Sequence, residues 1–170
     1  MPADRSIDGF PIIRELGRGA MGVVYEARHP ELDRTVALKL FNAGADSVAL
    51  LRFAREAELL ARVKHPNVLA IHTFGNAPEG PYLVTERVEG TDLQELLRNG
   101  RFDPGRAAAL VEQVARGVAA LHAQGVIHRD LKPANVIVDD ADTPTLLDFG
   151  LAMDVSAERL TQTGAVIGTP

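Results

Sequence analysis

The spacing of hydrophobic and polar positions changes along the chain. Short runs rich in β-branched and aromatic residues predict strands at 10–16, 23–29, 35–41, 68–75 and 81–88. One helix is expected among them, from Ser47 to just before His65-Pro66, because a residue that precedes proline disfavours helix. Its expected apolar face consists of Val48, Leu51, Ala54, Ala57 or Leu59, Ala61 and Val63.

The pattern becomes helical after residue 90. A short helix is expected to begin with a capping box formed by Thr91 and Gln94. Asp103 followed by Pro104 predicts the start of a longer helix, which is expected to end at Gly125. Its apolar positions are Leu110, Val111, Val114, Val118 and Leu121. Short strand-like pieces follow, so a β-rich region precedes an α-rich one, and this order favours two lobes with a ligand cleft between them.

Composition narrows the class of protein. The chain has 170 residues, 46% hydrophobic and 24% charged, as in ordinary globular proteins. A net charge of −5 gives no indication of a nucleic-acid or membrane-surface partner. The absence of cysteine excludes disulfides, thiolate metal sites and cysteine nucleophiles. Without a signal-peptide core or a membrane-length apolar run, a cytoplasmic protein, or a cytoplasmic piece of a larger one, is expected.

The first chemical motif is a G-x-G-x-x-G pattern formed by Gly17, Gly19 and Gly22. By itself the pattern is compatible with a flexible hairpin turn or with a dinucleotide site, which needs a helix after the glycines. The next residues, VVYEA, predict a strand instead. An extended hairpin whose glycines let backbone N–H groups approach phosphates therefore fits better.

Further motifs follow at defined intervals and give the glycine pattern a context. They are Val24, then Val36-Ala37-Leu38-Lys39, then Glu56, then His128-Arg129-Asp130-Leu131 with Asn135, and finally Asp148-Phe149-Gly150. In this order they resemble the motifs of eukaryotic-type serine/threonine protein kinases, most of all the bacterial members. The resemblance runs from about Phe10 to the last residue. It implies an α+β fold of two lobes, divided into a 1–9 extension, a 10–86 small lobe, an 87–90 hinge and a 91–170 partial large lobe.

The resemblance also implies catalytic roles. Lys39 would hold the α- and β-phosphates of ATP, with Glu56 as its partner and Glu58 as the runner-up. Asp130 would accept the proton of the substrate hydroxyl, although an aspartate in such a turn can also cap local backbone. Lys132, in "DLKPAN", would steady the transferred phosphate. Asn135 and Asp148 would bind Mg²⁺, with Mn²⁺ as an alternative.

The adenine is expected between apolar side chains, although the same positions could be plain core. Thr85 occupies the position that controls access behind the adenine, and Glu86 and Val88 would offer backbone groups to its edge. The residues implied to bind ATP are Leu16, Gly17, Arg18, Gly19, Ala20, Met21, Gly22, Val24, Ala37, Lys39, Thr85, Glu86, Val88 and Ile137.

Residues 148–170 match the activation segment of this family. Thr161 and Thr163 are the expected regulatory phosphorylation sites, and a dimer is one arrangement that would allow autophosphorylation. The expected partner is a protein substrate with serine or threonine. The family's A-P-E motif is not found before Pro170, so a fragment is expected. A non-catalytic nucleotide-binding or interaction module and a small-molecule phosphotransferase are the alternatives.

Overall fold

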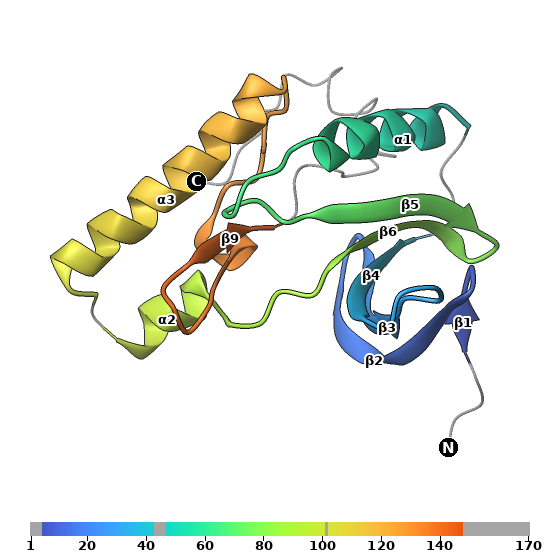
Figure 1. The fold of residues 1–170 in the computed structure, drawn as a ribbon, viewed down its shortest axis with the longest axis horizontal. Coiled ribbons are helices and arrows are strands. Elements are labelled where there is room, and N and C mark those ends of the chain that lie inside the picture. The colour runs from blue at the N-terminus through green and yellow to red at the C-terminus, as the bar shows by residue number, and fades with distance from the viewer. Residues whose placement is uncertain (1–4, 43–46, 101, 148–170) are drawn as a thin grey trace. The chain divides into compact units, whose positions relative to one another are not determined.

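The computed structural model describes residues 5–42, 47–100 and 102–147 (Figure 1). These residues form two compact units. The first contains the described residues up to Ala61 together with Ile71–Arg87, and the second contains Arg62–Ala70 and residues 88–147. The chain therefore passes into the second unit at Arg62, returns at Ile71 and passes over again after Arg87, within the predicted hinge at 87–90.

The first unit is built on an antiparallel sheet with the strand order β1-β2-β3-β4-β6-β5. The predicted strands are confirmed, with shifted ends. Together with β1, which was not predicted, the bounds are β1 Ser6–Ile7, β2 Phe10–Gly19, β3 Gly22–Arg28, β4 Thr35–Phe41, β5 Ile71–Ala77 and β6 Gly80–Glu86. The stretch 1–9, expected as an extension, contributes β1, and its Ile7 is fully buried in the sheet core.

The two faces of this sheet differ in burial. Along β3 and β4, Val23, Tyr25, Ala27, Val36, Leu38 and Leu40 are buried and form the core with Phe10 and Tyr82. The residues between them, Val24, Glu26, Ala37 and Lys39, are half-buried on the opposite face. This alternation follows from the two-residue period of a strand. We call the face formed by Val24, Glu26, Ala37 and Lys39 the half-buried face.

Helix α1, Ser47–Ala61, packs against β5 (Figure 1). The predicted apolar face was wrong in its first two positions, because Val48 is 53% and Leu51 is 72% exposed. Phe53, which the prediction omitted, is buried instead. Its ring meets Phe41 of β4 edge-on at a centroid distance of 5.1 Å and Phe74 of β5 at 6.3 Å. Aromatic packing in three dimensions therefore decides which face of α1 is buried.

The second unit combines helices with a small sheet of order β7-β8-β9. Its elements are β7 Thr91–Asp92, α2 Leu93–Asn99, α3 Pro104–Ala123, the 3₁₀ turn η1 Pro133–Asn135, β8 Val136–Val138 and β9 Pro144–Leu146. The predicted Asp103 cap of α3 is confirmed. The predicted capping box was wrong, because Asp92 caps α2 by accepting a hydrogen bond from the Glu95 N–H at 2.8 Å.

Residues 62–70 are attached to the second unit through Asn67. The Asn67 amide donates to the Pro144 carbonyl at 2.8 Å, and the Leu146 N–H donates to the Asn67 carbonyl at 2.9 Å. Helix α3 approaches closely at Gly117, where a Cβ would lie 2.9 Å from a Leu146 methyl carbon and 3.0 Å from the Asn67 oxygen. The prediction that Val111 belongs to the apolar face of α3 was wrong, because Val111 is 67% exposed.

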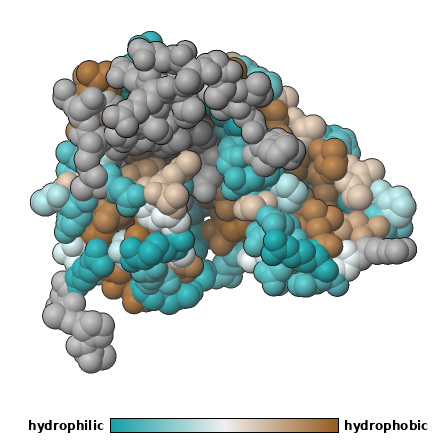
Figure 2. All heavy atoms as spheres, turned by 180° about the vertical axis from the view of Figure 1, so that it is seen from behind, coloured by the Kyte–Doolittle hydropathy of each residue, from teal (hydrophilic) through white to brown (hydrophobic). Residues whose placement is uncertain are grey.

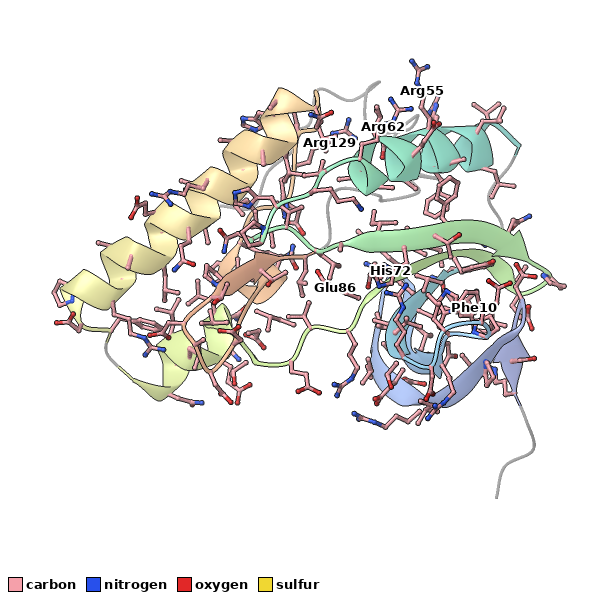
Figure 3. The ribbon with its side chains drawn as sticks, viewed as in Figure 1. Phe10, Arg55, Arg62, His72, Glu86 and Arg129 are labelled. Carbon is pink, nitrogen blue, oxygen red and sulfur yellow. The ribbon has the colours of Figure 1, made fainter. Side chains whose placement is uncertain are left out.

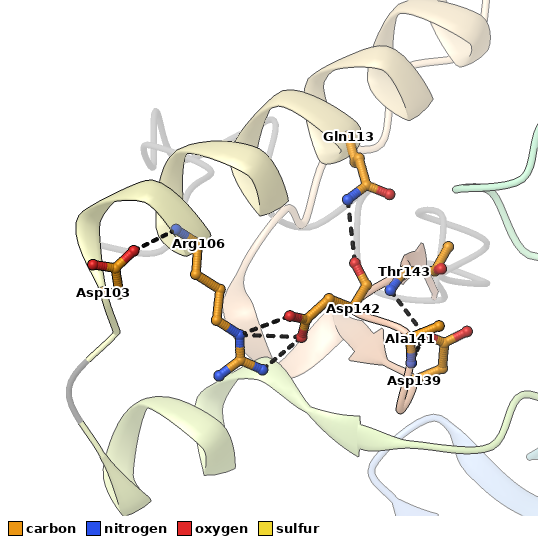
Figure 4. A network of polar contacts seen from close by, with 7 residues as sticks. All are labelled: Asp103, Arg106, Gln113, Asp139, Ala141, Asp142 and Thr143. Carbon is orange, nitrogen blue, oxygen red and sulfur yellow. Dashed lines mark hydrogen bonds and ion pairs between the residues drawn. The ribbon is translucent and has the colours of Figure 1, made fainter.

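The turn between β8 and β9 carries Asp139, Asp140 and Asp142, for which the sequence predicts a solvated turn between strands. Asp142 binds the Arg106 guanidinium with its carboxylate, at distances down to 2.6 Å, and accepts from Gln113 at its carbonyl (Figure 4). Asp139 accepts from the N–H groups of Ala141 and Thr143. The turn is therefore attached to α3, while the Asp142 side chain is still 49% exposed, as a solvated turn requires.

The described residues on the face seen in Figure 2 are a mixture of hydrophilic and hydrophobic ones. Within the described ranges, helices long and apolar enough to cross a membrane are absent.

Candidate functional site

The glycine motif forms the β2–β3 hairpin, in which Arg18 pairs with Val23 and Gly19 with Gly22. Ala20 and Met21 make the turn between the strands. The expectation of an extended hairpin is confirmed, and a dinucleotide site of the strand–helix type is excluded because a strand follows the glycines.

The three glycines serve different purposes. Gly22 has φ +150°, and a Cβ there would lie 2.1 Å from the Leu40 carbonyl oxygen, so the fold itself requires glycine. A Cβ at Gly17 or Gly19 would meet no described atom within 4 Å. Packing among the described residues therefore does not explain these two glycines, and their backbone is open to an approaching group.

Strand register places several residues that were predicted to contact ATP on the half-buried face. Val24 pairs with Lys39, and Ala37 pairs with Thr85. Thr85 is buried, and its hydroxyl donates to the carbonyl of Glu86 at 2.9 Å. Glu86 is the last residue of β6 (Figure 3). The strands thus bring together side chains that lie far apart in the sequence.

Helix α1 and Lys39 are linked by aromatic side chains. The Lys39 ammonium lies 5.5 Å from the centroid of Phe41, the ring that packs against Phe53 of α1. Glu56 follows Phe53 by three residues, on a neighbouring position of the same helix face. Glu56 is half-buried and Glu58 is exposed, which favours Glu56 as the partner of Lys39. The pairing itself stays a prediction.

In the second unit, three predicted catalytic residues form a hydrogen-bonded group. The Lys132 ammonium lies 2.7 Å from the Asp130 carboxylate. The amide of buried Asn135 donates to the Asp130 carbonyl at 2.8 Å and to its carboxylate at 3.0 Å. A carboxylate, a cation and an amide are thus concentrated within one turn of irregular backbone.

The backbone around this group is fixed at several points. Arg129 (Figure 3) has φ +63°, in the left-handed region that few non-glycine residues adopt. The ring Nε2 of buried His128 lies 2.9 Å from the Leu147 carbonyl oxygen, and the Leu147 N–H donates to the Asn135 carbonyl at 2.8 Å. His128 is therefore a structural residue, as predicted, and residues 128–135 are attached to the stretch after β9.

The charge state of Asp130 follows from its neighbours. The Lys132 hydrogen bond lowers the pKa of Asp130 below its ordinary value of 3.8, and the Asn135 amide acts in the same direction against the opposing effect of burial. Asp130 is therefore a carboxylate at neutral pH and can accept a proton.

Other predicted residues have varied surroundings. Arg18 forms an exposed ion pair with Glu15 at 2.7 Å. Leu16 and Met21 are exposed, whereas Val88 and Ile137 are half-buried.

In the described part of the chain, groups of three or more His, Cys, Asp or Glu residues suited to a metal are absent. Three predicted residues lie outside the described residues, namely Asp148, Thr161 and Thr163.

Glu26 was not among the functional residues predicted from the sequence. This glutamate stands in β3 two residues after Val24 and pairs across the ladder with Arg14. A charged residue in the middle of an alternating strand, opposite an arginine, was the available signal.

Comparison of the sequence with known proteins identifies a family that matches this chain. The family described as "Protein kinase domain" matches residues 10–170. The serine/threonine-protein kinase PknH of Mycobacterium tuberculosis is 43% identical over 163 residues, which cover 94% of this chain and 26% of the relative. The serine/threonine-protein kinase pkn2 of Myxococcus xanthus is 43% identical over 178 residues, covering 99% of this chain and 21% of the relative.

A solved structure agrees with the sequence relatives. The crystal structure of the M. tuberculosis PknI kinase domain superposes with a TM-score of 0.80 at 31% identity, covering 98% of this chain and 69% of that chain. The chain spans about a quarter of the length of the curated relatives it matches. The expected α+β kinase fold is confirmed, and the chain belongs to the protein kinase domain family, among the bacterial serine/threonine kinases.

Proposed function

We propose that the protein transfers the γ-phosphate of ATP to a serine or threonine hydroxyl of a protein substrate. The observation that carries the proposal is the group of Asp130, Lys132 and Asn135, held within hydrogen-bond distance of one another. Phosphoryl transfer asks for positioning and charge stabilisation more than for covalent chemistry by the protein. The serine/threonine kinases among the relatives support the choice of substrate.

Within this proposal Asp130 orients the substrate hydroxyl and accepts its proton. Its lowered pKa keeps the carboxylate ionised at neutral pH, so the acceptor is ready before the substrate arrives. The Lys132 ammonium beside it supplies positive charge where the negative charge of a phosphoryl group would otherwise repel the carboxylate.

The second unit also fits a magnesium ion. Asn135 uses its amide nitrogen for both hydrogen bonds to Asp130, and this turns its amide oxygen away from that residue. Amide and carboxylate oxygens suit Mg²⁺, or Mn²⁺ in its place. We propose Asn135 and Asp148 as the metal ligands. Bound magnesium would supply charge neutralisation to the phosphates.

The first unit contains groups suited to binding the phosphates and the base of the nucleotide. The space beside the backbone at Gly17 and Gly19 is open, so phosphates could approach the hairpin closely there. Val24 and Ala37 on the half-buried face offer an apolar surface to a base, and Lys39 on the same face offers a cation. ATP, when bound, supplies the transferred phosphoryl group. The remaining predicted contacts, including Glu86, Val88 and Ile137, belong to the same proposal.

Regulation and location complete the proposal. Thr161 and Thr163 would accept phosphate by autophosphorylation, between two copies of the chain in a dimer, and the added charge would attract arginine side chains such as that of Arg129. Because the reaction consumes ATP, we assign it to the cytoplasm.

The proposal is tested with purified protein, Mg²⁺, radiolabelled ATP and a generic basic substrate protein. Phosphate transfer is measured for the parent protein and for Asp130→Ala, and ADP binding is measured by calorimetry for both. We expect Asp130→Ala to reduce transfer by about 10²- to 10⁴-fold, since it loses its proton acceptor, while ADP binding persists.

The other possible outcomes of this experiment distinguish between the alternative functions. Equal transfer by both proteins would dismiss Asp130 as the catalytic residue. ADP binding by a parent protein that transfers no phosphate would favour the non-catalytic nucleotide-binding module. Transfer to a small-molecule alcohol in preference to protein would favour the small-molecule phosphotransferase.

A further inference from the structure

Glu26 lies between two arginines on the half-buried face of the first unit. One carboxylate oxygen is 2.5 Å from Nε of Arg14 in β2, and the other is 3.2 Å from Nε of Arg87. We call these three residues the Glu26 cluster. The side chains of Glu26 and Arg87 are only 13% and 25% exposed, so solvent screens their attraction less than that of a surface pair.

The position of Glu26 follows from strand register. It is two residues from Val24 on β3 and faces Ala37 across the ladder, and Ala37 in turn faces Thr85. The half-buried face therefore continues from the proposed base-contacting residues directly to Glu26. A carboxylate at such a position is costly unless cations lie close to it. Both arginines lie within ion-pair distance of Glu26, although its Oε2 forms no hydrogen bond among the described residues.

Arg87 lies where regular pairing stops. The β4–β6 ladder ends at the pair Val36 and Glu86, and Arg87 is the last residue of the first unit. Backbone pairing thus fixes Glu86 from one side, and the Glu26–Arg87 ion pair holds the next residue. The carbonyl of Glu86, which accepts the Thr85 hydroxyl, lies between these two attachments.

From this arrangement we infer that Glu26 is a positioning residue for nucleotide binding. Through Arg87 it fixes the backbone next to Glu86, whose backbone groups we have proposed as partners of the adenine edge. Arg14 neutralises the second carboxylate oxygen and ties β2, the strand that carries Gly17 and Gly19, to the same cluster. The inference rests on the proposed function, because it assigns Glu26 to the proposed nucleotide site.

The test uses Glu26→Gln, which keeps the shape of the side chain and removes its charge. We expect the KM for ATP and the Kd for ADP to rise about tenfold, with kcat changed by less than about twofold, because misplaced backbone groups weaken ground-state binding and Asp130 is untouched. Arg87→Met is expected to act similarly. Hydrogen exchange at the amides of residues 86–87 in nucleotide-free protein should become faster.

The double variant Glu26→Met with Arg87→Met keeps the test valid if a single variant folds poorly. Replacing both partly buried partners by apolar side chains leaves only the charge of Arg14, which is 56% exposed and therefore solvated, so the protein should recover its stability while ADP binding stays weak. Glu112→Gln is the matched control, because Glu112 forms an exposed ion pair with Arg116 on α3 and should leave KM and Kd unchanged.

Failure of this inference differs from failure of the proposed function. A parent protein that transfers phosphate, with Glu26→Gln showing lower thermal stability but unchanged Kd for ADP, would overturn the positioning role alone. A parent protein that binds ADP without transferring phosphate would overturn the proposed catalysis, and the Kd comparison would still decide the role of Glu26. A parent protein that binds no ADP would overturn both.

Discussion

Lys39 in the first unit and Asp130 in the second are held by different kinds of backbone. Lys39 stands in the middle of β4, between β3 and β6, so two ladders fix its position. Asp130 stands on irregular backbone, where the Asn135 amide and the Lys132 ammonium contact it directly. A strand position shares its support among many backbone bonds, whereas a loop position depends on a few side chains.

This difference has an energetic consequence. Replacing one side chain in a strand leaves its ladder bonds in place, because they join backbone groups. Replacing the Asn135 side chain removes two hydrogen bonds to one residue at once. We therefore expect substitutions around Asp130 to alter the reaction more strongly than substitutions of comparable size on the half-buried face.

Among the substitutions that leave Asp130 itself in place, Asn135→Leu has the largest expected effect. It should reduce phosphate transfer by at least about a hundredfold, because Asp130 loses its orientation and the proposed metal loses a ligand. It should also lower the free energy of unfolding by about 1–3 kcal/mol, because the Asp130 carbonyl loses its donor. Transfer assays and urea unfolding measure the two effects.

Asn99→Leu is the matched control, since Asn99 is exposed at the end of α2. Its free energy of unfolding should change by less than about 0.5 kcal/mol. If the two variants behaved alike, the loop would not depend on the Asn135 amide, and the contrast with the strands would disappear.

Gly22→Ala and Gly19→Ala test the comparison within the first unit. Gly22→Ala should lower the free energy of unfolding by about 1–3 kcal/mol or more, because the new Cβ meets the Leu40 carbonyl at a strained φ. Gly19→Ala should leave thermal stability nearly unchanged and weaken ADP binding, because its Cβ points into open space. Parallel melting curves and calorimetry separate the two. Equal destabilisation would contradict the distinction between fold-required and ligand-facing glycines.

The smallest expected effect concerns pH. Because the Asp130 pKa is lowered in the folded protein, its contribution to stability is present above pH 3.8 and is lost as the pH falls through the lowered value. Lys132→Met removes the largest cause of the shift, so the Asp130 pKa should rise towards 3.8. Carboxyl ¹³C NMR titration of Asp130 in both proteins measures this, and identical titration curves would exclude Lys132 as the cause.

Local sequence patterns were sufficient to predict much of the fold and many residues of the candidate site. Alternation predicted the strands, the Asp103-Pro104 pair predicted the start of α3, and the spacing of the motifs predicted the family. These features depend on neighbours within a few residues, or on motifs that the chemistry of phosphate transfer requires in a fixed order. Asp130, Lys132 and Asn135 were predicted individually from the motif that contains them.

Contacts between distant residues decided the rest. The prediction that Thr91 caps α2 was wrong, because the neighbouring Asp92 caps it. Which face of α1 is buried depended on Phe41 and Phe74, which come from two separate strands.

The sequence by itself determined the family, the order of strands and helices, and the identity of the residues that carry the proposed chemistry. Tertiary structure alone decided that Asn67 joins the second unit and that Glu26 lies between two arginines. The physical reason is that periodicity records whether a position is apolar, but not which distant group it meets. A buried amide or carboxylate is stabilised only by specific partners, and folding selects those partners.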